Sequence, residues 1–153
     1  MMGTAVLLDS GFLIRLMNPE EPLHQVAFDI FKKYITSGIS CKVSTIALAE
    51  YGVKGELRFL PTRYLQYVPF MYSHAEVAAS FMHRIIQVKQ ERGAVIQPRV
   101  IIPNDTKMFA QASADPEVFA FVSADAEARK VYDLLEDPGF DFVNIREMTV
   151  DVV

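Results

Sequence analysis

Apolar residues along this chain form short continuous runs that alternate with longer segments in which they recur every three or four positions. The continuous runs predict buried β-strands at residues 6–8 and 118–123, and mixed stretches predict further strands at residues 40–44 and 142–145. Residues 64–71 predict either a further strand or an extended segment. The predicted strands are therefore distributed along the whole chain.

The segments with helical spacing lie between these runs, at residues 12–17, 24–37, 46–57, 73–92, 104–113 and 125–135. In the second of them, Val26, Ile30 and Phe31 lie on one side of the expected helix, and Gly38 follows at the usual C-terminal position. Strands that alternate with helices favour an α/β fold with a mainly parallel sheet. Because no repeat or linker interrupts the pattern, residues 1–153 are predicted to form a single three-layer α/β/α domain.

Composition narrows the functional classes. The 153 residues are 51% hydrophobic and 22% charged, which is typical of a globular domain with a sizeable core. The net charge of −4 argues against a protein that coats nucleic acid through bulk electrostatics, but a nuclease with a bound metal stays possible. A single cysteine, Cys41, favours a reducing cytoplasm. No signal peptide precedes Asp9, and no run approaches the roughly 20 apolar residues of a membrane helix.

Acidic residues follow the apolar runs repeatedly. Asp9 comes after residues 6–8, Asp105 after residues 100–102 and Asp125 after residues 119–122, while Glu50 lies on the helix after residues 40–44. In an open parallel sheet, ligands bind beyond the carboxyl ends of the strands, so these acids are expected to converge. Carboxylates gathered in one crevice repel each other unless a cation lies among them. Oxygen-only ligands indicate Mg²⁺ or Mn²⁺.

Each acid also has an ordinary structural interpretation. An aspartate after a strand is most often a turn residue or a helix cap, and Asp9, Asp105 and Asp125 each fit that role individually. Glu50 is harder to explain this way, because it lies in a mostly apolar segment. The three histidines show no ligand spacing, so the metal hypothesis depends on the acids as a set.

Four short motifs carry a resemblance to a known family. They are Leu-Leu-Asp-Ser-Gly-Phe-Leu-Ile at 7–14, Ser-Thr-Ile-Ala-Leu-Ala-Glu at 44–50, Ile-Pro-Asn-Asp at 102–105 with Ala-Gln-Ala at 110–112, and Val-Ser-Ala-Asp at 122–125. In order and spacing they resemble the motifs of PIN-domain nucleases. The nearest group is the VapC-like toxins of type II toxin–antitoxin systems. The resemblance covers essentially the whole chain.

The resemblance implies a PIN-like fold and a metal-dependent endoribonuclease that hydrolyses RNA phosphodiesters. It also implies an antitoxin partner and a homodimer. Asp9, Asp105 and Asp125 are the expected Mg²⁺ or Mn²⁺ ligands, and Glu50 either joins them or orients the attacking water. Hydroxyl groups of Ser10 and Ser123 are expected to hydrogen-bond to the carboxylates or to water.

Basic residues near the motifs are candidates for contacts with RNA phosphates. Arg15 and Lys54 follow the first two motifs, and Lys107 follows Asp105, where the family usually has small or aliphatic residues. Lys107 either contacts a phosphate or points to solvent. Glu127 is the next acid after Asp125, and the sequence leaves open whether it joins the site.

Two other functions compete with the nuclease. A PIN-like fold without catalysis would act as a binding module, and Lys107 is the hint for it. A receiver-type phosphoacceptor domain also uses a strand-end aspartate and Mg²⁺. The sequence argues against a receiver, because the first strand ends in a single acid and no lysine follows the last strand. Aromatic residues around Pro61 and Pro69 predict either a dimer or partner surface, or a lid over the core.

Overall fold

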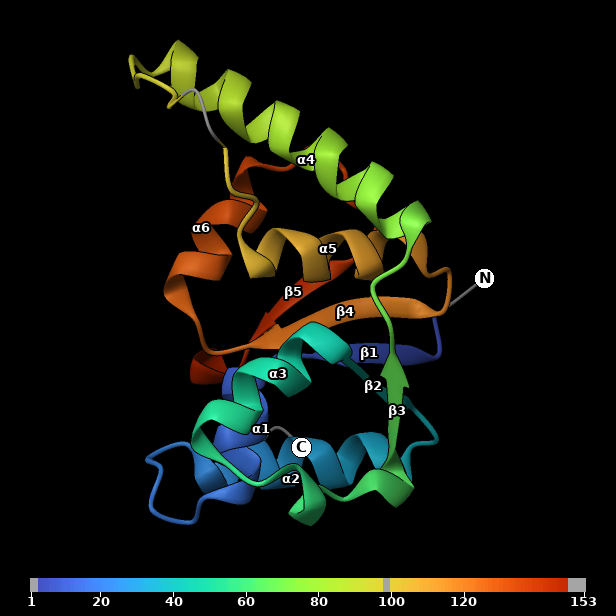
Figure 1. The fold of residues 1–153 in the computed structure, drawn as a ribbon. Coiled ribbons are helices and arrows are strands. Elements are labelled where there is room, and N and C mark those ends of the chain that lie inside the picture. The colour runs from blue at the N-terminus through green and yellow to red at the C-terminus, as the bar shows by residue number, and fades with distance from the viewer. Residues whose placement is uncertain (1–2, 98–99, 149–153) are drawn as a thin grey trace.

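The computed structural model describes residues 3–97 and 100–148, and its centre is a five-stranded parallel sheet (Figure 1). The strands are β1 (Ala5–Leu8), β2 (Ser40–Ser44), β3 (Leu65–Val68), β4 (Val118–Ser123) and β5 (Asp141–Asn144). Their order in the sheet is β3-β2-β1-β4-β5. The chain thus moves outward from β1 to β3 and then crosses to β4 on the other side of β1. Ligands of open α/β sheets bind at such a reversal, beyond the carboxyl ends of the strands.

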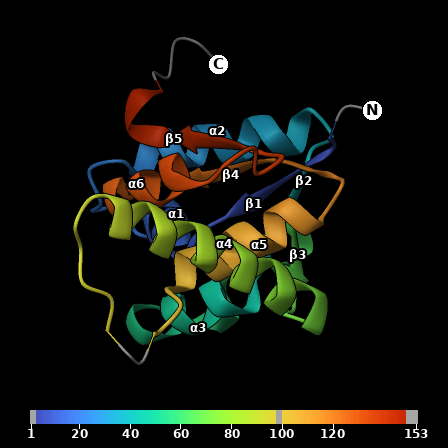
Figure 2. The same ribbon diagram turned by 90° about the horizontal axis from the view of Figure 1, so that it is seen from above.

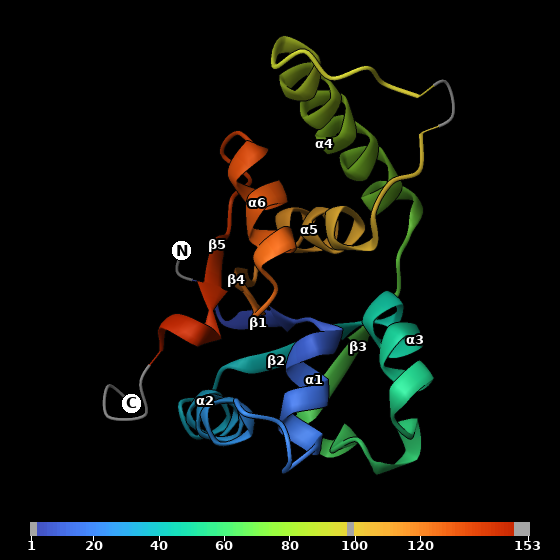
Figure 3. The ribbon, with the colours of Figure 1, turned by 90° about the vertical axis from the view of Figure 1, so that its left-hand side faces the viewer.

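Helices cover both faces of the sheet. On one side lie α1 (Ser10–Met17), α2 (His24–Thr36) and α3 (Thr45–Lys54), and on the other lie α4 (Tyr72–Glu91), α5 (Asn104–Ala114) and α6 (Ala126–Leu134) (Figures 1 and 3). Helix α4 packs on α5 as an outer layer (Figure 2). The short 3₁₀ helices are η1 (Leu57–Phe59), η2 (Thr62–Tyr64) and η3 (Ile145–Glu147). The predicted three-layer α/β/α fold is therefore confirmed.

The core explains why the central strands read as continuous apolar runs. All four residues of β1 are buried, because helices cover both of its faces and β2 and β4 flank it. On one face, Phe12 and Leu13 of α1 are fully buried. On the other, Phe109 of α5 packs edge-on against Phe121 of β4, with ring centroids 4.9 Å apart. Packing on both faces holds the carboxyl ends of β1 and β4 side by side.

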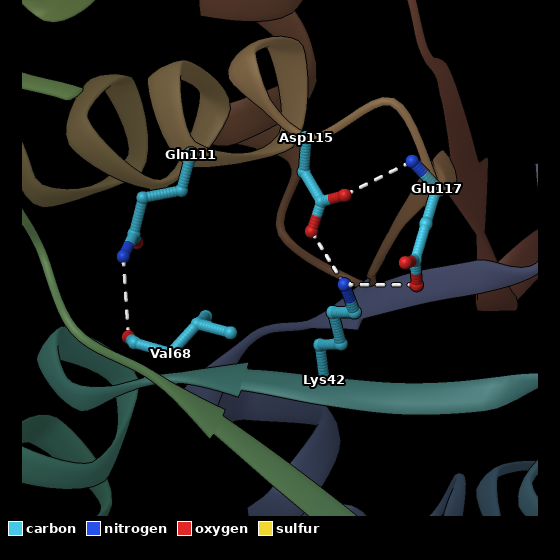
Figure 4. A network of polar contacts seen from close by, with 5 residues as sticks. All are labelled: Lys42, Val68, Gln111, Asp115 and Glu117. Atoms are coloured by element: carbon cyan, nitrogen blue, oxygen red, sulfur yellow. Dashed lines mark hydrogen bonds and ion pairs between the residues drawn. The ribbon is translucent and has the colours of Figure 1, made fainter. Parts of the chain in front are cut away.

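One charged residue interrupts this apolar interior. Lys42, in β2, is 5% exposed, and its Nζ lies 2.6 Å from Oδ2 of Asp115 and 3.4 Å from Oε2 of Glu117 (Figure 4). Nearby, Nε2 of Gln111 donates to the carbonyl oxygen of Val68 over 3.2 Å. These contacts tie β2 and β3 to α5 and to the turn before β4. They stabilise the sheet from the face that α5 covers.

The predicted strands at 6–8, 40–44 and 118–123 coincide with β1, β2 and β4, and residues 64–71 contain β3. The apolar run 100–102 differs, because it forms no strand. Ile101 is 78% exposed, and Pro103 leads directly into α5. Asp105 therefore reaches the sheet edge on a helix rather than at a strand end. Within the described ranges, no helix is long and apolar enough to cross a membrane.

Candidate active site

Asp9 stands between β1 and α1 and is the most buried of the candidate acids. Its backbone is extended, and its Oδ1 accepts a hydrogen bond of 2.7 Å from the amide nitrogen of Phe12, which caps the helix. The residue is only 6% exposed. The capping role expected of an isolated aspartate is thus real, but the burial exceeds what a surface cap requires.

Burial raises the pKa of Asp9 to about 6, because the charged form loses its hydration. Hydrogen bonding from the Ser123 hydroxyl and from the Phe12 amide lowers the pKa, and so does the positive charge of Arg15. The carboxylate of Asp125 raises it further. Asp9 and Asp125 therefore lie close enough to repel each other when both are ionised.

Asp125 begins α6 just after β4. Its Oδ1 accepts from the amide of Glu127 over 2.9 Å, and its own amide donates to Oγ of Ser123 over 3.0 Å. Ser123 is fully buried, so it holds the turn that carries Asp125. The carboxylate of Glu127 is engaged elsewhere, 3.1 Å from Nζ of Lys130 on the exposed side of α6. Glu127 is thus paired with Lys130 and does not line the hollow that Asp9 and Asp125 line.

Glu50 connects two of the predicted motifs. Its Oε1 accepts from the Ser10 hydroxyl over 3.2 Å, and its Oε2 accepts from Nδ2 of Asn104 over 3.4 Å. Ser10 begins α1 and Asn104 begins α5, so this one side chain of α3 bridges both helix layers. Its carboxylate is held at the edge of the sheet where α1 and α5 begin.

Asp105 lies in the first turn of α5. Its Oδ1 accepts from the amide of Thr106 over 2.6 Å and from the Thr106 hydroxyl over 3.3 Å. Burial raises the pKa of Asp105, and the negative charges of Asp125 and Glu50 raise it further. The four acids therefore form a chain of neighbours, from Asp9 through Asp125 and Asp105 to Glu50.

The chemistry of these side chains suits a hard divalent cation. All the donors are oxygens, three of the acids (Asp9, Glu50 and Asp105) are partly or fully buried, and the neighbouring negative charges repel one another. Their present geometry is not a finished ligand shell: across residues 3–97 and 100–148, no three His, Cys, Asp or Glu side chains are grouped so that they could hold a metal ion. Asp105 and Glu50 turn their oxygens toward Thr106, Ser10 and Asn104 instead. A cation would require these side chains to rotate.

Asp9 and Asp125 line a hollow of about 480 Å³, and two arginines line it with them. Arg15 donates from Nη1 to the carbonyl oxygen of Gly11 over 3.0 Å. A side chain at position 11 would bring a Cβ to 3.0 Å from that nitrogen, so the Arg15 side chain would have to shift by a few tenths of an ångström. Acidic and basic side chains therefore line the same hollow.

The second arginine, Arg146, is not among the site residues predicted from the sequence. It lies in η3 directly after β5, and its Nε donates to the carbonyl oxygen of Ala124 over 2.9 Å. Its position beyond the carboxyl end of a parallel strand is the signal that could have revealed it. Lys54 and Lys107, two predicted RNA contacts, are not among the residues that line the hollow.

Sequence comparisons find no matching family model and no matching curated protein. Solved structures do match. A chain of VapBC2 from Rickettsia felis, crystallised bound to a DNA fragment from its promoter, has a TM-score of 0.60 at 15% identity, over 92% of this chain and 98% of that one. A chain of the DNA-bound VapBC from Salmonella typhimurium has a TM-score of 0.56 at 15% identity, over 95% and 99% of the two chains. The likeness extends over the whole domain, and it confirms that this chain has the PIN-like fold predicted from its four motifs.

Proposed function

We propose that this protein is a metal-dependent endoribonuclease of the VapC-like kind, which hydrolyses RNA phosphodiesters with Mg²⁺ or Mn²⁺. The observation that carries the proposal is the neighbourhood of Asp9, Asp125, Asp105 and Glu50, which four separate segments bring to one edge of the sheet. Burial and the neighbouring negative charges disfavour the charged forms of Asp9 and Asp105. A cation bound among them would remove both penalties.

In this proposal Asp9, Asp105 and Asp125 hold the cation, and Glu50 either joins them or orients the attacking water. A bound divalent cation lowers the pKa of a water and stabilises the charge that develops on the phosphate. The Phe12 amide keeps the Asp9 carboxylate in place, and the Ser123 hydroxyl fixes the backbone of Asp125. Ser10 and Asn104 hold the two oxygens of Glu50 in opposite directions, which sets the orientation of that carboxylate.

RNA is the proposed substrate, and Arg15, Lys54 and Lys107 remain proposed phosphate contacts. A net charge of −4 requires such contacts to be local rather than spread over the surface. The lone Cys41 is buried and its pKa is raised to about 12, so it stays an unreactive thiol suited to the cytoplasm, the proposed location.

An antitoxin partner and a homodimer are also proposed. The resemblance to VapC-like toxins implies both, and the matched solved structures are of VapBC. Exposed apolar side chains at Phe59, Tyr64 and Tyr72 support a protein-binding surface rather than a lid, while Leu60 beside them is buried in the core.

A binding module without catalysis is the alternative that a specific observation favours, namely the unfinished ligand geometry of the acids within the described residues. The strand order of the sheet argues against the receiver alternative. A receiver of the flavodoxin-like type has the strand order 2-1-3-4-5. This sheet has the order β3-β2-β1-β4-β5.

Cleavage of a pool of structured RNAs by the purified, antitoxin-free protein tests the proposal. The reactions contain Mn²⁺, Mg²⁺ or EDTA, and the variants are Asp9→Asn and the matched control Asp29→Asn on α2. Cleavage that needs a divalent cation, disappears with Asp9→Asn and persists with Asp29→Asn supports a nuclease site. A folded wild-type protein that cuts no RNA with either metal would favour the binding module.

A further inference from the structure

Arg146 is oriented by the backbone of the acidic site. Its Nε donates to the carbonyl oxygen of Ala124, the residue between Ser123 and Asp125, over 2.9 Å. A guanidinium has five N–H donors in a rigid plane, so this bond fixes the plane and leaves the donors on Nη1 and Nη2 for other partners. Arg146 lines the same hollow as Asp9 and Asp125.

Within the described part of the chain, the guanidinium of Arg146 forms no ion pair with the neighbouring acids. Among the described residues, no ion pair joins Arg146 or Arg15 to a carboxylate, although both line a hollow with two aspartates. Each arginine instead donates to a backbone carbonyl, Arg15 to Gly11 in the first turn of its own helix α1 and Arg146 to Ala124 in the turn between β4 and α6. The two guanidiniums are thus held by the start of the helix that Asp9 caps and by the turn that carries Asp125.

A phosphodiester is the ligand that this arrangement fits. A planar guanidinium binds two phosphate oxygens at once, and arginine is the usual residue where such recognition is needed. We infer that Arg146 binds an RNA phosphate at the edge of the acidic site, with Arg15 as a second anchor that lines the same hollow. This inference rests on the proposed function and adds a substrate-binding residue that positions the RNA backbone against Asp9 and Asp125.

A purely structural role for Arg146 would look different. If it served only to hold the Ala124 carbonyl, removing its charge while keeping a donor would leave RNA affinity unchanged. Arg146→Gln makes that change, because the glutamine amide still donates a hydrogen bond. Arg146→Lys keeps the charge but loses the two-oxygen geometry. The matched control is Lys33→Ala, which removes one charge from the last turn of α2, just before the start of β2 and so at the opposite edge of the sheet.

The test is the affinity of the full chain for a labelled single-stranded RNA in EDTA, measured by fluorescence anisotropy on the Asp9→Asn background at several salt concentrations. We expect Arg146→Gln to weaken binding about ten- to hundredfold, the effect of a lost charge-assisted hydrogen bond. The slope of log affinity against log salt should fall in magnitude by about 0.7, the value for one phosphate contact on a single strand. Arg146→Lys and Lys33→Ala should keep the slope of the parent.

Unchanged affinity in a folded Arg146→Gln protein would overturn the inference. So would an equal loss of slope in Arg146→Lys or Lys33→Ala, or no RNA binding by the parent chain. Thermal melting of each variant reports folding. Cleavage by the wild type is measured separately, so the two failures can be distinguished: cleavage without a contribution from Arg146 to binding rejects only the arginine contact, and arginine-dependent binding without cleavage rejects only the nuclease.

Discussion

The hydroxyl of Ser10 donates a hydrogen bond to Oε1 of Glu50 over 3.2 Å, between residues 40 positions apart in the chain. Ser10 follows the buried Asp9 at the start of α1, and Glu50 lies on α3. The bond therefore joins the first two acidic motifs directly. It is the contact that relates the orientation of Glu50 to the position of Asp9.

Ser10→Ala should lower RNA cleavage about tenfold, because residues that orient metal-site carboxylates typically contribute ten- to hundredfold. The free energy of unfolding should change by about 1 kcal/mol or less, since the bond is only partly buried. Initial cleavage rates and urea unfolding measure the two effects. Ser80→Ala on the exposed side of α4 is the control. Full activity in the Ser10→Ala protein would show that this bond does not position Glu50 for catalysis.

The raised pKa of Asp9 makes a prediction about stability in EDTA. The Asp9 carboxyl has a pKa of about 6 in the folded protein, against 3.8 for the ordinary group. Protonation of Asp9 therefore contributes fully to stability below pH 3.8, and this contribution is lost as pH rises through about 6. The loss is on the order of 3 kcal/mol for a group this buried. Asp105 contributes in the same direction.

Asp9→Asn should therefore gain stability relative to the wild type between about pH 4 and pH 7.5, by a few kcal/mol. Asparagine remains a good helix cap, so the Phe12 contact is kept. Urea unfolding of both proteins at each pH gives this difference in the free energy of unfolding. The contributions of other titrating groups cancel in the difference, because both proteins share them. Adding Mn²⁺ near neutral pH should stabilise the wild type and leave Asp9→Asn unchanged. A stability difference that does not vary with pH would contradict the burial penalty.

The Lys42 network predicts unequal effects from its two acids. Asp115→Asn should cost about 3 kcal/mol of unfolding free energy, because it leaves a buried ammonium without its close partner. Glu117→Gln, whose carboxylate is 58% exposed and more distant, should cost about 1 kcal/mol or less. The acids raise the pKa of Lys42, so the pair stabilises the fold at neutral pH and is lost only in strong alkali. Urea unfolding at neutral pH tests this, and equal costs would refute it.

The strands that flank the site could be predicted because both of their faces are covered. Residues of β1 and β4 are almost all buried, so their sequences are continuous apolar runs that end where Asp9 and Asp125 follow. Residues 100–102 show the limit of this pattern. That run is apolar, but it pairs with no strand, and Ile101 is exposed. Periodicity alone does not reveal whether an apolar run has a neighbour.

Contacts distant in sequence could not be predicted. In the sequence, Lys42 is only a polar residue that interrupts a strand. Its partner Asp115 lies 73 positions further along the chain, and only the folded structure brings the two within 2.6 Å. Arg146 follows the end of β5, but its hydrogen bond to the turn at Ala124, 22 positions earlier, has no local pattern that predicts it. The acids were found because strand ends are marked in the sequence by turn residues. The arginines around them are positioned by tertiary structure.

Mn²⁺ binding to the antitoxin-free protein, followed by electron paramagnetic resonance, tests the central claim most directly because it needs no RNA. We expect stoichiometric binding near neutral pH that weakens as pH falls below about 6, where Asp9 takes up its proton. Binding should be lost in Asp9→Asn and Asp125→Asn and kept in Asp29→Asn. If the wild-type protein binds no Mn²⁺, or if all three variants bind it equally, the four carboxylates do not form a metal site.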